Sequence, residues 1–291
     1  MIKVFAILIM GSVLVPKHGA GEVFPEVIYG EDNRRDLYEL GIGKSQLKNW
    51  ARSTAIISSQ SKVKDSSLYG FKKLVTKSLE SAQNVCSDEP YAEQPIGGWC
   101  TGFLVKEDVL VTAGHCITSE SRCATAAIIF DYGYAKGDEQ LEYAKEDNIY
   151  SCKKIISQEY DSGRGLDYAV IQLDRKVRGR TPLKLRTHGK VSSYASLTVI
   201  GHPTGLPTKV AEGAYVRENN NSDYFVSNTD TYGGNSGSPV LNANGLVEGV
   251  LVRGEKDFVQ RGSCNVSYRC AANECRGEDV TRSTTFAHLI P

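Results

Sequence analysis

The sequence has no excess of charge of either sign, because its 291 residues include 34 lysines and arginines and 34 aspartates and glutamates. A chain without net charge gives no electrostatic reason to bind nucleic acid or an anionic membrane. Beyond Val15 the chain also lacks any apolar run long enough to cross a bilayer. We therefore expect no nucleic acid as partner and, once the N-terminus is removed, no membrane, while the oligomeric state stays open.

Metal-binding patterns are also lacking. The eight cysteines include no CxxC pair, and no histidine lies among the clustered Cys264, Cys270 and Cys275, so zinc remains only an alternative for this cluster. We expect no metal and no cofactor. An even number of cysteines favours disulfides formed in an oxidising compartment. Eight cysteines allow roughly a hundred pairings, and Cys123 with Cys152 is suggested only by proximity.

The N-terminus has the pattern of an export signal. Lys3 is followed by an apolar run that ends at Val15, which is short for a membrane span and typical of a secretory signal. We expect residues 1–20 to be the signal peptide, and residues 21–52 to be a short pro-segment, as in a zymogen, and an N-terminal arm. The alternatives are a short membrane anchor or a buried first strand. The expected location of the protein is therefore outside the cell.

A glycine-rich stretch, Gly233–Pro239, has the sequence GGNSGSP. Glycines on both sides of a serine let the backbone bend sharply enough to present one hydroxyl and to aim neighbouring amides at the same point. This arrangement predicts Ser236 as a nucleophile. The alternative is a polar turn between two strands.

A serine hydroxyl needs a base beside it, because it is a weak nucleophile at neutral pH. Of the five histidines, only His115 ends a pattern of two expected strands, which begin at Trp99 and Val109. Asp167 stands at the start of a strongly apolar strand and is the candidate for the carboxylate that orients the histidine. The chain order is therefore His, Asp, Ser.

Three motifs in this order, TAGHC at 112–116, LDYAV at 166–170 and GGNSGSP at 233–239, resemble those of the chymotrypsin-like serine peptidases. They look most like the bacterial branch that includes the glutamyl endopeptidases, and the resemblance covers roughly residues 27 to 252. It implies an all-β fold of two packed antiparallel β-barrels with the active-site cleft between them. Residues 53–185 would form the first barrel, and residues 186–291 the second barrel with a cysteine-rich C-terminal segment. Many glycines, tyrosines and short β-branched runs independently favour an all-β protein.

The resemblance also implies roles for individual residues. The catalytic residues would be His115, Asp167 and Ser236, with the backbone amides of Gly234 and Ser236 as the oxyanion hole. A disulfide would join Cys100 to Cys116. The substrate main chain would pair with the edge strand Val252, Arg253 and Gly254.

We therefore expect a secreted serine endopeptidase that acts on proteins or peptides. Two other classes remain as alternatives. One is a non-proteolytic binding protein with the same fold. The other is an esterase or lipase, although these enzymes order the triad Ser, Asp, His on an α/β sheet.

The preferred residue before the cleaved bond, P1, is predicted by counting from Ser236 in alignment with the family. Asp230 falls where trypsin-like members hold the aspartate of the specificity pocket, and Thr231 where glutamyl endopeptidases hold a threonine. Leu251 stands where the glutamate-specific enzymes have histidine. An acidic P1 side chain would be repelled by Asp230, whereas lysine or arginine would be bound, so we expect a preference for basic P1 residues. The alternatives are a glutamate or other P1 preference, with Asp230 neutralised by the Val27 amine or serving as a structural acceptor for turn amides.

Overall fold

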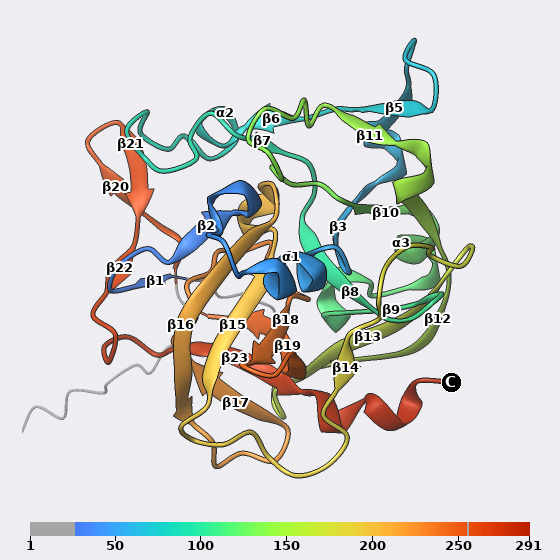
Figure 1. Cartoon of the computed structure of the whole chain (residues 1–291). Coiled ribbons are helices and arrows are strands. Elements are labelled where there is room, and N and C mark those ends of the chain that lie inside the picture. The colour runs from blue at the N-terminus through green and yellow to red at the C-terminus, as the bar shows by residue number, and fades with distance from the viewer. Residues whose placement is uncertain (1–26, 255) are drawn as a thin grey trace, which may run out of the picture.

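The computed structural model describes residues 27–254 and 256–291. The expected signal peptide, residues 1–20, and residues 21–26 of the expected pro-segment lie outside the described residues. Two closed six-stranded antiparallel β-barrels, side by side, form the body of the protein, as Figure 1 shows. The expected all-β fold is therefore confirmed.

The first barrel closes because each of its six strands is hydrogen-bonded to two neighbours, so that no edge is left unpaired. Around the barrel the strands are β3 (Thr54–Ser59), β8 (Cys100–Lys106), β9 (Val109–Thr112), β13 (Leu166–Leu173), β12 (Ile149–Asp161) and β10 (Ala126–Phe130).

The second barrel closes through a pairing between β19 and β23. Around it the strands are β15 (Ser196–Gly201), β16 (Lys209–Glu218), β17 (Tyr224–Ser227), β23 (Glu278–Arg282), β19 (Leu246–Arg253) and β18 (Pro239–Asn242). The turn signal Asn244–Gly245 lies between β18 and β19, as expected for a hairpin. The short strand β14 (Lys184–Leu185) adds to the outside of β19 in parallel.

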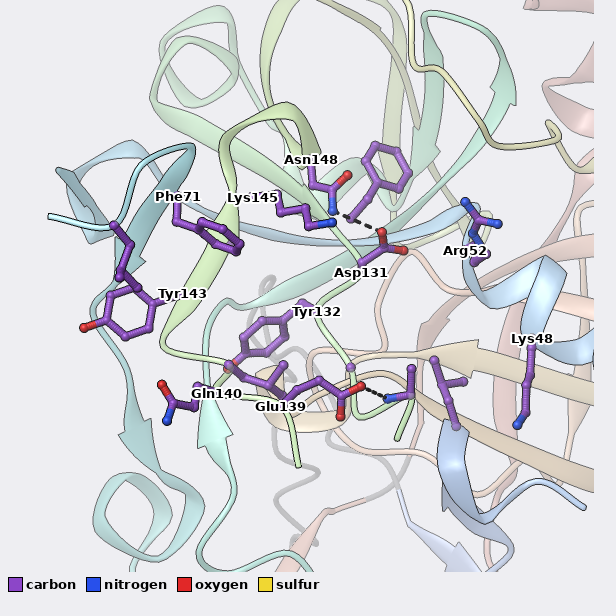
Figure 2. Close-up of a pocket in the computed structure, with 17 residues that line it drawn as sticks. Lys48, Arg52, Phe71, Asp131, Tyr132, Glu139, Gln140, Tyr143, Lys145 and Asn148 are labelled. Carbon is purple, nitrogen blue, oxygen red and sulfur yellow. Dashed lines mark hydrogen bonds between the residues drawn. The ribbon is translucent and has the colours of Figure 1, made fainter. Parts of the chain in front are cut away.

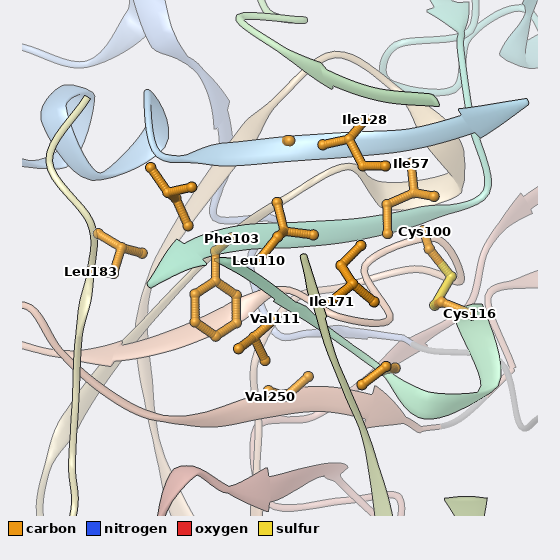
Figure 3. Close-up of a cluster of buried hydrophobic side chains, with 14 of the residues drawn as sticks. Ile57, Cys100, Phe103, Leu110, Val111, Cys116, Ile128, Ile171, Leu183 and Val250 are labelled. Atoms are coloured by element: carbon orange, nitrogen blue, oxygen red, sulfur yellow. A yellow bond between two sulfur atoms is a disulfide. The ribbon is translucent and has the colours of Figure 1, made fainter. Parts of the chain in front are cut away.

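Buried apolar side chains fill the first barrel and continue into its contact with the second. Phe103, Leu110 and Ile171 of the first barrel belong to the same cluster as Val250 of the second (Figure 3). The second barrel has its own smaller core, which includes Leu251. The shared cluster fixes how the two barrels sit against each other, which any site between them requires.

The N-terminal arm, residues 27–36, is bound to the outside of the second barrel. Its strand β1 (Ile28–Tyr29) pairs with β22 (Arg269–Cys270), and its strand β2 (Arg34–Asp36) pairs with β16. An ion pair between Asp36 and Lys209, both almost completely buried, adds to this attachment. The arm is followed by η1 (Leu37–Glu39) and by the helix α1 (Ser45–Ala51).

Residues 58–93, which are rich in serine and lysine, contain regular structure. A three-stranded sheet forms from β4 (Val63–Asp65), β5 (Phe71–Leu74) and β11 (Tyr143–Lys145), and a two-stranded sheet from β6 (Lys77–Ser78) and β7 (Pro95–Ile96). The strand β11 lies in the charged run 136–147, and pairing with β5 satisfies its backbone. The remaining elements are η2 (Gln60–Lys62), α2 (Leu79–Gln83), η3 (Gly114–Cys116), α3 (Glu120–Thr125), η4 (Glu146–Asn148), η5 (Pro203–Gly205), β20 (Phe258–Arg261), β21 (Cys264–Ser267), η6 (Ser283–Thr285) and η7 (Ala287–Leu289).

All eight cysteines form disulfides, in the pairs Cys86–Cys264, Cys100–Cys116, Cys123–Cys152 and Cys270–Cys275. The pairing implied by the family resemblance and the one suggested by proximity are both present. The sulfurs of the C-terminal cluster are all in disulfides, so they offer no thiolate to zinc. Within residues 27–254 and 256–291, no helix has the length and hydropathy that a membrane span requires.

Candidate active site

Asp167 holds His115 through both of its carboxylate oxygens. Its Oδ2 lies 2.7 Å from Nδ1 of the His115 ring, and its Oδ1 accepts the backbone N–H of His115 at 3.0 Å. Asp167 is only 2% exposed, so no solvent competes for these bonds. A proton on Nδ1, donated to the carboxylate, leaves Nε2 unprotonated and able to act as a base.

The fold brings these two side chains together through two paired strands. Asp167 is the second residue of β13, and His115 follows β9 on the short helix η3. Since β13 and β9 are antiparallel neighbours, the start of β13 lies beside the end of β9. The disulfide Cys100–Cys116 then ties the residue after His115 to the adjacent strand β8.

Ser236 comes from the second barrel, on the loop between β17 and β18, and its loop is bonded to the first barrel. The backbone N–H of Thr101 in β8 donates to the carbonyl oxygen of Ser236 at 2.9 Å. A Cβ at Gly237 would lie 2.0 Å from the carbonyl oxygen of Thr101, and Gly237 has φ +92°. Only glycine therefore permits this close approach. The structure thus brings all three motifs to one end of strands β8 and β9.

Two backbone amides beside Ser236 are open. Among the residues that the structure describes, the N–H groups of Gly234 and Ser236 donate to no protein acceptor. Gly234 has φ +97°, and its carbonyl oxygen is held by the Thr101 hydroxyl at 2.9 Å. Free amides on a fixed loop next to a nucleophile are the groups that an oxyanion hole needs.

His202, the other histidine that follows a strand, lies buried and is not part of this arrangement. Its Nδ1 lies 3.0 Å from the carbonyl oxygen of Leu206. Burial lowers the pKa of His202 to about 3, so the ring is neutral at physiological pH. Its carbonyl oxygen lies 2.8 Å from the position that a Cβ on Gly234 would occupy, which places His202 behind the serine loop as a structural residue.

Asp230 is covered by the N-terminal arm. Its Oδ1 accepts the backbone N–H of Tyr29 at 2.7 Å and its Oδ2 accepts that of Asn33 at 2.9 Å. Burial raises the pKa of Asp230 to about 6, against the opposing effect of these two amides. These two contacts match the alternative in which Asp230 serves as a structural acceptor for backbone amides. The expectation that it contacts a P1 side chain directly lacks support, because the arm occupies both oxygens.

A second buried carboxylate, that of Glu278, was not predicted from the sequence. It lies beside two of the residues expected to bind substrate: Thr231 Oγ1 is 3.4 Å from its Oε2, and a Cβ on Gly254 would be 1.5 Å from the same oxygen. The Tyr29 hydroxyl donates to Oε1 at 3.2 Å. Tyr29 therefore contacts both Glu278 and Asp230. The available signal in the sequence was the acidic pair Glu278–Asp279 at the start of a short strand in the cysteine-rich segment.

The other residues of the expected substrate strand have structural partners. Val252 is 1% exposed and belongs to the shared core. The Arg253 side chain donates to Asp279 Oδ2 at 2.8 Å. The strand β19 ends at Arg253, and Gly254 follows it beside Glu278.

Comparison with known proteins agrees with this fold. The trypsin-like peptidase domain family matches residues 100–250. This is more than half of the chain, which therefore belongs to the trypsin-like peptidase family. No curated protein matches the sequence.

Among solved structures, a Glu endopeptidase in complex with MPD is similar, with 16% identity, a TM-score of 0.51, and coverage of 91% of this chain and 97% of that one. A serine mutant of Rv3671c from M. tuberculosis, in its inactive form, has 13% identity and a TM-score of 0.47, covering 86% of this chain and 90% of that one. The first likeness confirms the two-barrel fold and the resemblance to the bacterial chymotrypsin-like peptidases.

Proposed function

We propose that the protein is a secreted serine endopeptidase with His115, Asp167 and Ser236 as its catalytic triad. The observation that carries the proposal is the pair of hydrogen bonds from His115 to both oxygens of Asp167. They orient a histidine beside a serine loop that is packed against the same strands. The family membership supports peptidase activity, with proteins or peptides as substrates.

In this mechanism Ser236 Oγ attacks the peptide carbonyl while His115 Nε2 takes the hydroxyl proton and later gives it to the leaving amine. The negative charge that develops on the carbonyl oxygen is stabilised by the amides of Gly234 and Ser236, at about 3 kcal/mol for each donor. Asp167 keeps the imidazole in the reactive tautomer and stabilises its cationic form. The residues involved need no metal to carry out these steps.

For the P1 preference we propose basic residues, with Glu278 as the main acidic partner. Its carboxylate lies between the wall residue Thr231 and the end of the substrate strand at Gly254. A P1 lysine or arginine reaching this place meets a buried carboxylate, and an arginine gains charge-assisted hydrogen bonds. Tyr29 contacts both Asp230 and Glu278. Asp230 therefore lies close enough to add negative charge to this part of the site.

Secretion is supported by the N-terminal pattern of residues 1–20 and by the pairing of all eight cysteines. Disulfides persist in oxidising compartments. The proposal predicts that the protein recovered outside the cell begins after Ala20, which N-terminal sequencing measures. Protein that keeps Met1 and stays cell-associated would contradict it.

The catalytic assignment is tested by proteolysis of casein with Ser236→Ala and with Ser67→Ala as matched control, since Ser67 lies exposed on a distant hairpin. The Ser236 variant is expected to lose about a millionfold in turnover with an unchanged circular dichroism spectrum. The control is expected to keep full activity. Activity within tenfold of wild type in Ser236→Ala would remove the triad assignment.

The P1 assignment is tested by profiling a peptide library with wild-type enzyme and with Glu278→Gln. We expect cuts after arginine and lysine, and a loss of about 10 to 100-fold in kcat/KM for arginine peptides relative to neutral P1 peptides in the variant. Glu142→Gln, at a remote exposed position, is the control. A majority of cuts after glutamate, or a profile unchanged by Glu278→Gln, would refute the assignment while leaving the triad intact.

A further inference from the structure

A pocket of about 610 Å³ opens on the first-barrel side, between the helix α1, the strand β5 and the segment from Phe130 to Asn148 (Figure 2). None of His115, Asp167, Ser236 or the expected substrate-binding residues lines it. The proposed peptidase mechanism therefore gives this pocket no role.

The walls of the pocket are largely apolar. They include the rings of Phe71, Phe130, Tyr132 and Tyr143 and the side chain of Leu141. Phe71 and Tyr143 are only half-buried, so part of the apolar wall contacts solvent. Pockets of this size with apolar and aromatic walls are typical of small-molecule sites.

The two carboxylates of the pocket are hydrogen-bonded within the protein. Asp131 accepts two hydrogen bonds from the Arg180 guanidinium, at 2.7 and 2.8 Å, and one from Asn148 at 3.0 Å. Glu139 accepts three backbone N–H groups between 2.8 and 3.0 Å. Neither carboxylate is therefore left for a cationic ligand.

The three basic residues of the pocket, Lys48, Arg52 and Lys145, form no ion pair with any of the residues that the structure describes. Lys48 and Arg52 are four residues apart at the end of α1, so they lie on one face of the helix. Figure 2 shows both on the same side of the pocket, with their charged ends directed away from each other. Apart from Glu139, the charges of the pocket that have no partner of opposite charge are therefore positive, and two of these three lie at the end of α1.

Backbone strain occurs at the same place. Asp131 has φ +57°, a left-handed conformation that costs free energy in a residue other than glycine. The bidentate bond to Arg180 holds it, and its neighbours in the chain, Phe130 and Tyr132, both line the pocket. The strained residue thus fixes two aromatic walls and turns its own charge toward Arg180.

We propose that this pocket is a binding site for a small carboxylic acid with an apolar body, such as a medium-chain fatty acid. The hydrocarbon chain packs on Leu68, Phe71 and Tyr143, where it removes exposed apolar surface from water. The carboxylate binds one of the two cationic side chains at the end of α1, Lys48 or Arg52. The site is independent of the triad, so a ligand there does not block the nucleophile.

The test is calorimetric titration of the secreted protein with sodium dodecanoate. The expected result is saturable binding at one site. Acetate, which has the charge without the chain, and dodecyltrimethylammonium, which has the chain with the opposite charge, are expected to bind at least tenfold more weakly. Equal binding of dodecanoate and dodecyltrimethylammonium, or no saturable binding of dodecanoate, would overturn the proposal.

Two variants locate the site. The double variant Lys48→Gln with Arg52→Gln is expected to weaken dodecanoate binding about tenfold or more. Its matched control, Lys106→Gln with Lys153→Gln, removes two exposed charges outside the pocket and is expected to bind as wild type. Equal affinity in the two double variants would overturn the assignment of the carboxylate.

The second variant fills the pocket without removing a buried contact. Ala135 lines it and is exposed, so Ala135→Trp is expected to fold and to abolish saturable binding. Casein hydrolysis reports on folding and is expected to stay at the wild-type rate. Wild-type affinity for dodecanoate in a folded Ala135→Trp variant would place any binding elsewhere and refute the proposal.

Discussion

The burial of Asp230 predicts a specific dependence of stability on pH. The pKa of this carboxyl group is raised from 3.8 to about 6 in the folded protein, so the folded state holds the proton more tightly than the unfolded state. Stability contributed by protonated Asp230 is therefore full below about pH 4 and falls until about pH 6. The difference between a pKa of 3.8 and one of about 6 corresponds to roughly 3 kcal/mol of folding stability.

The perturbation is Asp230→Asn, which removes the charge at every pH. The asparagine can accept only one of the N–H groups of Tyr29 and Asn33, which costs about 1 to 3 kcal/mol, but this loss is the same at all pH values. The stability of the variant relative to wild type should thus rise by about 3 kcal/mol between about pH 3 and about pH 7.5.

Guanidinium unfolding followed by tryptophan fluorescence measures this difference. Asp138→Asn, at an exposed position, is the control and should show no such change with pH. The reasoning would be refuted if the stability difference between Asp230→Asn and wild type did not change with pH, or if the variant became less stable relative to wild type as the pH rises. It would mean that the two amides outweigh burial and that Asp230 is held ionised.

Three further predictions concern the triad and the framework. Asp167→Asn should lower kcat on peptide substrates by about 10⁴-fold, measured with a chromogenic peptide, whereas a loss below tenfold would contradict the role given to this carboxylate. Replacing Cys100 and Cys116 together by serine should lower the free energy of unfolding by roughly 3 kcal/mol, for a sequence separation of 16; unchanged urea unfolding would contradict this. Asp36→Ala should destabilise by about 3 to 5 kcal/mol, because it leaves the buried ammonium of Lys209 unpaired, and a loss below about 1 kcal/mol in urea unfolding would show that the pair is not needed.

The barrels and the triad motifs were predictable because their signals are local. A strand that ends at His115, a strand that begins near Asp167 and a glycine-rich loop around Ser236 each occupy a few consecutive residues. Strand alternation and turn residues then determine where the side chains point. The packing of these strands and loops into two barrels was predicted from the family resemblance.

The surroundings of the specificity pocket were not predictable in this way. The contacts of Asp230 come from Tyr29 and Asn33, about 200 residues earlier in the chain, and no local pattern reports such a pairing. Glu278 reaches Thr231 because β23 pairs with β17, where Glu278 lies opposite Ser227. The disulfide between Cys86 and Cys264, with a sequence separation of 178, likewise depends on the tertiary fold.

The central claim is that Ser236 is an activated nucleophile, and labelling with a serine-reactive phosphonate tests it most directly. Purified wild-type protein should take up one phosphonate per chain, located on Ser236 by peptide mass spectrometry, and should lose casein hydrolysis in step with labelling. Ser236→Ala should take up none. Labelling of Ser236→Ala to the same extent, or an unlabelled wild-type protein that still hydrolyses casein, would contradict the account.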